Sequence, residues 1–337
     1  MHAYELQAFG FDHLKRVERP KPQPGPGELL VAIKCTSLNY RDYLTVIGEY
    51  NPRLKLPLIP LCDGAGEVIG VGPGVKNFKT GDRIVGNFAQ DWVSGKPTID
   101  QLRTSLGGPL DGCLVEQRIF PEHGVVKIPD YMSYEEASTL PCAGLTAWSA
   151  TMQARTKAGD TVLVLGTGGV SMFALQFAKM HGATVIITSS SDEKIERALA
   201  LGADHSINYR TKPNWSKEVR RITKMAGADH VIEVGGAGTL EHSIFSTRLF
   251  GHISLIGVLA GGKSEVNMVP VLMQNITVQG VLVGGRDGFE EMLRAMTLHK
   301  TKPVIDRVFD FSEAVDAFRY LEAGKHFGKV CIRVGQN

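Results

Sequence analysis

The most constraining feature of the sequence is a segment that begins at residue 162 and contains four patterns in a fixed order. An apolar stretch comes first, a glycine-rich turn follows, and then come a helical stretch and a second apolar stretch (residues 162–165; Gly166, Gly168 and Gly169; residues 170–181; residues 184–188). This order, a strand followed by a glycine turn, a helix and a second strand, is the first unit of a dinucleotide-binding fold. The run therefore predicts a dinucleotide cofactor. The alternative is a glycine-rich turn in an unrelated α/β protein.

The glycine turn itself predicts how the cofactor is held. Gly166 permits a sharp exit from the strand, and Gly168 lets the backbone approach a pyrophosphate closely. The helix that follows offers unpaired N–H groups and the positive end of its dipole to that anion. Ser171 stands where a third glycine is common. We expect the cofactor to contact the turn at Gly166, Thr167, Gly168, Gly169 and Val170.

The end of the second apolar run indicates which nicotinamide cofactor binds. NAD-binding proteins place an Asp or Glu there, about 20 residues on, to bind a ribose hydroxyl. This chain has Thr188, Ser189, Ser190 and Ser191 instead, with Lys194 soon after. Hydroxyls can donate to a 2′-phosphate and a lysine can neutralise it. The sequence therefore predicts NADP(H), bound by Ser189, Ser190 and Lys194. The alternative is that the serines only cap a helix at 192–201.

Composition excludes several classes of protein. The 337 residues suffice for about two domains, and 43% hydrophobic with 21% charged residues is ordinary for a soluble globular protein. A net charge of +2 gives no electrostatic case for nucleic-acid or membrane binding. The N-terminus lacks the pattern of a signal peptide, and five scattered cysteines suit reduced thiols. We expect a cytoplasmic protein without a transmembrane segment.

The order of short patterns predicts two kinds of domain. The first third contains closely punctuated strands, typical of a barrel-like β domain (29–37, 64–71, 83–86, 115–119, 125–128). Ser133 and Glu136 then form a capping-box pattern. Strands separated by helices follow, the rhythm of a parallel sheet (161–165, 184–188, 205–207, 230–233, 252–256, 277–283). Helices are expected at 290–298 and 311–323, and a last strand at 329–334. Residues 91–112 have no clear periodicity, as in a long functional loop.

Several segments together resemble the medium-chain dehydrogenase/reductase superfamily, and within it the zinc-independent quinone oxidoreductase and enoyl reductase branch. They are GAGEVIGVGPGVKNFKTGDRIVG, LPCAGLTAWSA, GTGGVS, GADHSINYR, GKVCIRV and the stretch from Pro22 to Tyr50. The resemblance implies an α/β chain with a GroES-like β-barrel catalytic domain (1–140 and 290–337). It also implies a Rossmann NADP(H)-binding domain with a doubly wound parallel sheet (141–289). It further implies a homodimer that pairs edge strands, here residues 277–283.

The resemblance also bears on metal. Zinc-dependent members hold catalytic zinc with Cys, His and Cys, helped by a Glu, and the matching positions here are Asn39, Cys62, Cys142 and Asp63. A catalytic zinc site needs three protein ligands, and two thiols remain. We therefore expect no metal. A poor site built from Cys62, Cys142 and Asp63 is the alternative. The four clustered cysteines of the family's structural zinc lobe are absent from residues 87–112.

The same resemblance implies two catalytic residues. Asparagine at the position of Asn39 contacts the substrate carbonyl or the nicotinamide ribose in the zinc-free branch. Tyr50 falls near the proton-donating tyrosine of the enoyl reductases. The alternatives are that Asn39 only shapes its own loop and that Tyr50 is a packing residue. Thr146 lies where the family's threonine approaches the nicotinamide, and Tyr209 where a tyrosine flanks the adenosine phosphate.

Glycines after strands complete the expected cofactor site. Carboxyl ends of parallel strands face the ligand crevice, so residues there are candidate cofactor walls. They are Gly235, Gly257, Val258 and Gly284.

Taken together, these features predict an NADPH-dependent oxidoreductase that transfers hydride to a quinone, enone or other activated carbonyl without metal. The first alternative is a secondary-alcohol dehydrogenase with a degenerate zinc site. The second is a non-catalytic NADPH-binding protein. The sequence does not name the small-molecule substrate, nor does it decide between C=O, C=C and quinone reduction.

Overall fold

The computed structural model describes residues 1–335. The chain divides into two compact units. Unit 1 contains Met1–Leu145 and returns from Val283 onward, and unit 2 contains the residues between, 146–282. Both boundaries differ by a few residues from the expected 140/141 and 289/290. Val283 packs against the hydrophobic core of unit 1, and the backbone N–H of Arg286 donates to Trp92 O at 2.9 Å. These contacts place the segment before residue 290 in unit 1.

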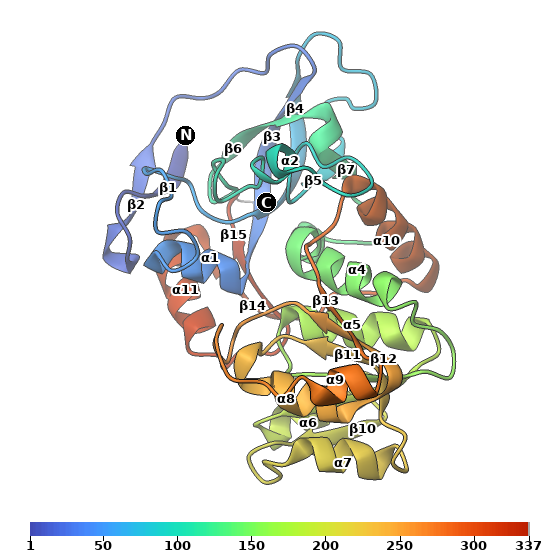
Figure 1. The fold of residues 1–337 in the computed structure, drawn as a ribbon. Coiled ribbons are helices and arrows are strands. Elements are labelled where there is room, and N and C mark those ends of the chain that lie inside the picture. Colours follow the sequence, from blue (N-terminus) through green and yellow to red (C-terminus); the bar gives the residue numbers. More distant parts are fainter. Residues whose placement is uncertain (336–337) are drawn as a thin grey trace. The chain divides into compact units, whose positions relative to one another are not determined.

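Unit 1 is built on a seven-stranded sheet with the order β14-β15-β3-β4-β5-β7, in which β6 also pairs with β3. All of its neighbours are antiparallel except β14 and β15. A separate antiparallel pair joins β1 and β2. The bounds are β1 (His2–Leu6), β2 (Leu14–Glu18), β3 (Glu28–Leu38), β4 (Asp63–Val71), β5 (Arg83–Gly86), β6 (Gln117–Pro121), β7 (Val125–Lys127), β14 (Ile305–Asp310) and β15 (Lys329–Arg333). These strands can be followed in Figure 1.

The strands predicted in unit 1 are present, with shifted ends. Strand β6 begins later than the expected 115–119, because Val115 forms a bridge with Ala3 instead. The last strand, β15, returns to pair with β3 in the register Val330↔Leu38. This register places Lys329, the residue before Val330, beside the end of β3.

The helices of unit 1 are mostly short. They are α1 (Tyr40–Ile47), α2 (Ile99–Leu102), α3 (Tyr134–Ser138), α10 (Arg286–His299) and α11 (Ala314–Glu322), with a π-helical turn at Leu140–Gly144. The predicted capping box is confirmed, because Ser133 accepts from Glu136 N and the Glu136 side chain accepts from Ser133 N. Residues 91–112 are mostly irregular but anchored: Trp92 is buried and Gly95 N donates to Asp287 Oδ2 at 3.0 Å.

Unit 2 contains a six-stranded parallel sheet with the order β10-β9-β8-β11-β12-β13. The strands are β8 (Thr161–Val164), β9 (Thr184–Ser189), β10 (His205–Asn208), β11 (Ala228–Glu233), β12 (Thr247–Leu255) and β13 (Thr277–Gly280). The helices are α4 (Leu145–Gln153), α5 (Gly169–Met180), α6 (Asp192–Ala200), α7 (Trp215–Ile222), α8 (Ala237–Ser246) and α9 (Val269–Met273). The predicted α/β sheet is therefore confirmed. Strand β13 lies at the edge, as expected, but stops at Gly280, because its partner β12 ends at Leu255.

Burial explains why the unit 2 strands read as continuous apolar runs. Val162, Leu163 and Val164 of β8 are all buried, as expected for a parallel strand covered on both faces. No described helix is long and apolar enough to cross a membrane.

Candidate active site

The glycines predicted to line a cofactor meet at one edge of the unit 2 sheet. Strand β11 pairs in parallel with both β8 and β12. Gly166, Gly235 and Gly257 follow these three strands soon after their carboxyl ends. Parallel strands end at the same side of a sheet, and this side is where open α/β sheets bind ligands. Unit 2 thus brings together one glycine of the expected pyrophosphate turn and two of the expected cofactor walls.

The turn after β8 has the geometry that its glycines suggested. Gly166 has φ +70°, which favours glycine, and its N–H donates to Thr188 Oγ1 at 3.2 Å. Gly168 is the N-cap of α5, and a side chain built there would meet no atom within 4 Å. Gly169 and Val170 form the first turn of α5, and Thr167 is buried. The first N–H groups of α5 are therefore placed beside an uncrowded backbone.

Ser171 has a structural role. Its buried hydroxyl donates to Leu165 O at 2.7 Å. This bond joins the first turn of α5 to the end of β8. A glycine at this position could not make it.

The end of β11 is organised by a carboxylate that the sequence analysis missed. Glu233 is fully buried. Its Oε1 accepts from Gly235 N at 2.7 Å, from Gly236 N at 3.0 Å and from Thr239 Oγ1 at 2.6 Å. Its Oε2 accepts from the Ser243 hydroxyl. The local signal in the sequence is a carboxylate two residues before a glycine pair.

Packing adds a reason for the glycines at this edge. A Cβ on Gly257 would lie 2.4 Å from Val234 O, and one on Gly235 would lie 2.3 Å from Thr239 Oγ1. Glycine is therefore required by contacts within the chain, besides any room that a cofactor needs. Val258, next to Gly257, is about half exposed.

The serines predicted to bind a phosphate at the end of β9 differ in their surroundings. Ser189 is buried and its Oγ accepts from Ser191 N at 3.3 Å. Ser191 is the N-cap of α6 and accepts from Lys194 N at 3.3 Å. The capping alternative is thus correct for Ser191. Ser190 is partly exposed, and so is Tyr209 after β10.

Two expected cofactor residues do not belong to the strand ends of this edge. Thr146 is buried in the first turn of α4. Gly284 belongs to unit 1.

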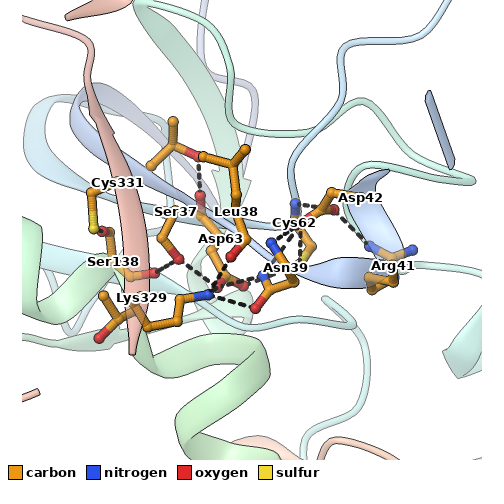
Figure 2. A network of polar contacts seen from close by, with 12 residues as sticks. Ser37, Leu38, Asn39, Arg41, Asp42, Cys62, Asp63, Ser138, Lys329 and Cys331 are labelled. Carbon is orange, nitrogen blue, oxygen red and sulfur yellow. Dashed lines mark hydrogen bonds and ion pairs between the residues drawn. The ribbon is translucent and has the colours of Figure 1, made fainter. Parts of the chain in front are cut away.

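The predicted catalytic asparagine lies in a buried polar cluster of unit 1, shown in Figure 2. Asn39 precedes α1, and its Nδ2 donates to Asp63 Oδ2 at 2.9 Å and to Asp42 Oδ2 at 3.3 Å. Its Nδ2 also lies 3.4 Å from Cys62 Sγ. Asp42 Oδ2 accepts in addition from Asn39 N at 2.9 Å. Both amide hydrogens of Asn39 are therefore directed at acceptors within the chain.

Lys329 completes the cluster from β15. Its Nζ donates to Leu38 O at 2.7 Å and to Asn39 Oδ1 at 2.5 Å, and lies 3.6 Å from Asp63 Oδ2. The side chain is only 3% exposed. Sequence reasoning missed this residue, because a single lysine at the start of an apolar run is usually a solvated strand end.

The second predicted catalytic residue, Tyr50, is joined to the cluster through Arg41. The Arg41 guanidinium lies 4.9 Å from the centre of the Tyr50 ring and 4.9 Å from that of Phe88. Arg41 also forms an ion pair with Asp42 at 3.4 Å and donates to Leu106 O at 3.1 Å. Tyr50 is 52% exposed.

Burial dominates the acid–base properties of this cluster. It raises the pKa of Asp42, with a further upward contribution from the nearby Asp63 carboxylate and opposing contributions from Arg41 and Lys329. Burial also raises the pKa of the Cys62 thiol well above its usual range, and contact with Cys142 and the two carboxylates adds to the rise. Cys62 is therefore a neutral thiol at neutral pH.

These residues do not fit the catalytic zinc site that the resemblance describes. Among residues 1–335 no group of three or more His, Cys, Asp and Glu is arranged to hold a metal ion. Asn39 presents amide hydrogens, which cannot ligate a cation. The Asp63 carboxylate is shared by donors from Ser37, at 2.9 Å, and Asn39.

Comparison with known proteins identifies the family. Residues 25–130 match the alcohol dehydrogenase GroES-like domain, and residues 169–297 match the zinc-binding dehydrogenase domain. The chain belongs to the zinc-type alcohol dehydrogenase-like, medium-chain dehydrogenase/reductase family. It is an NAD(P)H-dependent oxidoreductase by that membership.

Relatives within the family carry two kinds of name. A zinc-type alcohol dehydrogenase-like protein from Schizosaccharomyces pombe is 42% identical over 96% of both chains. A chloroplastic quinone oxidoreductase from Triphysaria versicolor is 30% identical over 98% of this chain and 96% of its own. The solved structure of a putative alcohol dehydrogenase from Sinorhizobium meliloti is 41% identical, with a TM-score of 0.92 over 99% of this chain and 98% of its own.

Proposed function

We propose that this family member is an NADPH-dependent reductase that transfers hydride to a quinone, enone or other activated carbonyl without a metal ion. Two observations support the proposal. The glycine turn lies at the carboxyl end of β8 with hydroxyls, and no carboxylate, at the end of β9. The cluster at Asn39 lacks a donor set suited to zinc.

The cofactor supplies the hydride when it is bound, and the chain supplies binding and orientation. Pyrophosphate binding is assigned to the turn from Gly166 to Val170, where α5 presents free N–H groups. Recognition of the 2′-phosphate is assigned to Ser190 and Lys194, with Ser189 behind them. A mycobacterial structure 28% identical to this chain, with a TM-score of 0.83, is named as a complex with NADPH. A second solved structure, 35% identical to this chain with a TM-score of 0.92, is named as an NAD-dependent alcohol dehydrogenase.

Binding titrations of NADPH and NADH test the cofactor assignment. We expect tighter NADPH binding by the native chain. Lys194→Ala should weaken NADPH binding about tenfold, equivalent to about 1.4 kcal/mol, while NADH binding changes little. Arg197→Ala, one turn further along α6, is the control. Tighter NADH than NADPH binding by the native chain would refute the assignment.

The chemical step needs a hydrogen-bond donor for the oxygen that gains charge. Tyr50 is the proposed proton donor, because about half of the residue is exposed and its ring packs against Arg41. Asn39 is proposed to donate a hydrogen bond from its side-chain amide to the substrate oxygen. Its two hydrogens already face Asp63 and Asp42, so a substrate oxygen must replace one of these acceptors to receive a bond from it.

A screen of NADPH oxidation over quinones, enones, enoyl thioesters and aldehydes tests the reaction. We expect turnover with at least one class, and we expect Asn39→Ala and Tyr50→Phe each to lower kcat by about a hundredfold on that class. A chain that binds NADPH but oxidises it with no class would be a non-catalytic binding protein. Oxidation of secondary alcohols alone, lost on chelation and restored by zinc, would establish the alcohol dehydrogenase alternative. That alternative is kept because several relatives, 31% and 29% identical, are named alcohol dehydrogenases.

The assembly we propose is a homodimer through strand β13. All four of its residues are exposed and it is an edge strand. Val278 in β13 and Leu282, two residues beyond its end, present apolar side chains that are 37% and 56% exposed. An edge with apolar side chains is normally covered by another strand, and a second copy of the same edge supplies one.

A further inference from the structure

Two thiols of unit 1 lie against each other beside Asn39. Cys62, the residue before β4, is fully buried, whereas Cys142 in the π-helical turn is partly exposed. The turn packs against β4, and Cys142 packs against the hydrophobic core that contains Cys62. The two side chains contact each other. Thiols that already touch need only a small movement to reach disulfide geometry.

A second pair of thiols in unit 1 is enclosed by protein. Cys35 in β3 and Cys331 in β15 are both fully buried and contact each other. The Ser138 hydroxyl lies 3.5 Å from Cys35 Sγ and 3.9 Å from Cys331 Sγ. Oxidation from solution favours thiols that are accessible to solvent. The two pairs therefore differ in one respect that matters for oxidation, which is the exposure of Cys142.

The surroundings of Cys62 supply an acceptor for its proton. Its Sγ lies 3.1 Å from Asp63 Oδ1 and 3.9 Å from Asp42 Oδ2, and Figure 2 shows the side chain among these carboxylates and Asn39. A neutral thiol is a weak nucleophile until its proton leaves, and the Asp63 carboxylate is placed to receive it. Cys62 is therefore suited to attack a partner that has already been oxidised.

We propose that Cys62 and Cys142 form an oxidation site, at which hydrogen peroxide converts the two thiols into a disulfide. The sulfur of Cys142 attacks one peroxide oxygen, the O–O bond breaks, and the thiol proton joins the departing oxygen as water, which leaves a sulfenic acid. Cys62 then attacks the Cys142 sulfur. The S–S bond forms and the S–O bond breaks. The Cys62 proton passes through Asp63 to the departing hydroxide, which leaves as a second water. The thiols lose two electrons and the peroxide gains them.

The disulfide acts on the surroundings of Asn39. Its Nδ2 lies 3.4 Å from Cys62 Sγ, and it also donates to Asp63. Oxidation removes the hydrogen that Cys62 donates to the same carboxylate and draws its sulfur toward Cys142. The expected effect on turnover rests on the proposed function, whereas formation of the disulfide does not.

Peptide mapping tests the site in the full-length chain. Native protein is incubated with hydrogen peroxide at neutral pH, its remaining thiols are blocked, and it is digested without reductant for mass spectrometry. We expect one disulfide, between Cys62 and Cys142. The buried thiols should stay reduced and serve as internal controls (Cys35, Cys113 and Cys331). Cys142→Ser should form no disulfide. Cys62→Ala should leave Cys142 as a sulfenic acid that dimedone traps, because the second thiol is missing.

Several outcomes of the mapping overturn the proposal. They are a Cys142 that oxidises beyond the sulfenic acid while Cys62 stays a free thiol, a Cys142 that stays reduced until the chain unfolds, and a disulfide that joins another pair. If Cys62→Ala does not fold by circular dichroism, Cys142→Ser decides the order of the steps. Cys62 should then stay reduced in peroxide, and its oxidation would refute first attack by Cys142.

Turnover measured on the same samples tests the effect on Asn39. Native protein that carries the disulfide should lose at least about tenfold in kcat and recover it in dithiothreitol. Cys142→Ser should have the same kcat before and after peroxide. Unchanged turnover in the oxidised native chain would overturn the effect on Asn39, whereas a native chain that is inactive before oxidation contradicts only the proposed function.

Discussion

The hydroxyl of Ser171 donates a hydrogen bond to the carbonyl oxygen of Leu165, and the two atoms are 2.7 Å apart. Both residues are buried. The bond joins α5, the helix that follows the glycine turn, to the end of the strand that precedes the turn. A serine in place of the usual third glycine is thus compatible with the turn. A glycine lets the helix pack closely on the strand, whereas Ser171 holds the two together by a hydrogen bond.

Ser171→Ala should destabilise the chain by about 1–2 kcal/mol, because it leaves a buried carbonyl without this donor. Urea denaturation followed by circular dichroism measures the change. Ser312→Ala is the control, since Ser312 is exposed. Equal stabilities of the two variants would contradict a structural role for the bond.

Glu233→Gln should weaken the loop that holds Gly235 and Gly236. The carboxylate accepts four hydrogen bonds, and an amide can accept fewer and carries no charge. We expect a loss of about 1–3 kcal/mol in stability and about tenfold weaker NADPH binding, equivalent to about 1.4 kcal/mol. Glu241→Gln, which changes an exposed glutamate of α8 in the same way, should change neither quantity. Unchanged NADPH binding in Glu233→Gln would separate this carboxylate from the cofactor site.

His230 should make the chain less stable in mild acid. Burial, with a smaller contribution from His252, lowers its pKa to about 3, and its ring contacts Thr156 and Ser254. The unfolded chain takes up the proton near pH 6.5 and the folded chain does not, so stability falls as pH falls from about 6.5 toward 3. The slope is up to about 1.4 kcal/mol per pH unit for one group.

The measurement compares the free energy of unfolding of native protein and His230→Asn at several pH values below neutrality. The variant should show a smaller loss of stability on acidification. His299→Asn is the control because His299 is exposed. A variant with the same pH dependence as native protein would rule out His230 as the group responsible.

Val278→Lys should convert the proposed dimer into a monomer. A lysine on an edge strand disfavours pairing with another strand, and Val278 lies in β13 at the edge of its sheet. Light scattering after size exclusion gives the mass in solution. Leu298→Lys adds the same charge at a residue that is 80% exposed in α10, and should leave the dimer intact. A native monomer, or a dimer that survives Val278→Lys, would contradict the assignment of the interface.

Local patterns predicted much of the architecture. The glycine turn, the capping box at Ser133 and the alternation of strands with helices in unit 2 each depend on neighbouring residues, and the structure contains all three. The ends of strands were less predictable. Strand β13 stops at Gly280 because its partner stops, which is a pairing effect that its own residues do not encode.

The sequence by itself determined the cofactor class, the sheet type of each unit and the family, because these follow from spacing and from local backbone requirements. Only the tertiary structure decided what surrounds Asn39. The ammonium of Lys329 reaches Asn39 because β15 returns to β3 in one register. Opposite charges stabilise a buried cluster only when they lie within a few ångströms of one another. Residues that lie far apart in the chain acquire such distances only when the sheet has formed.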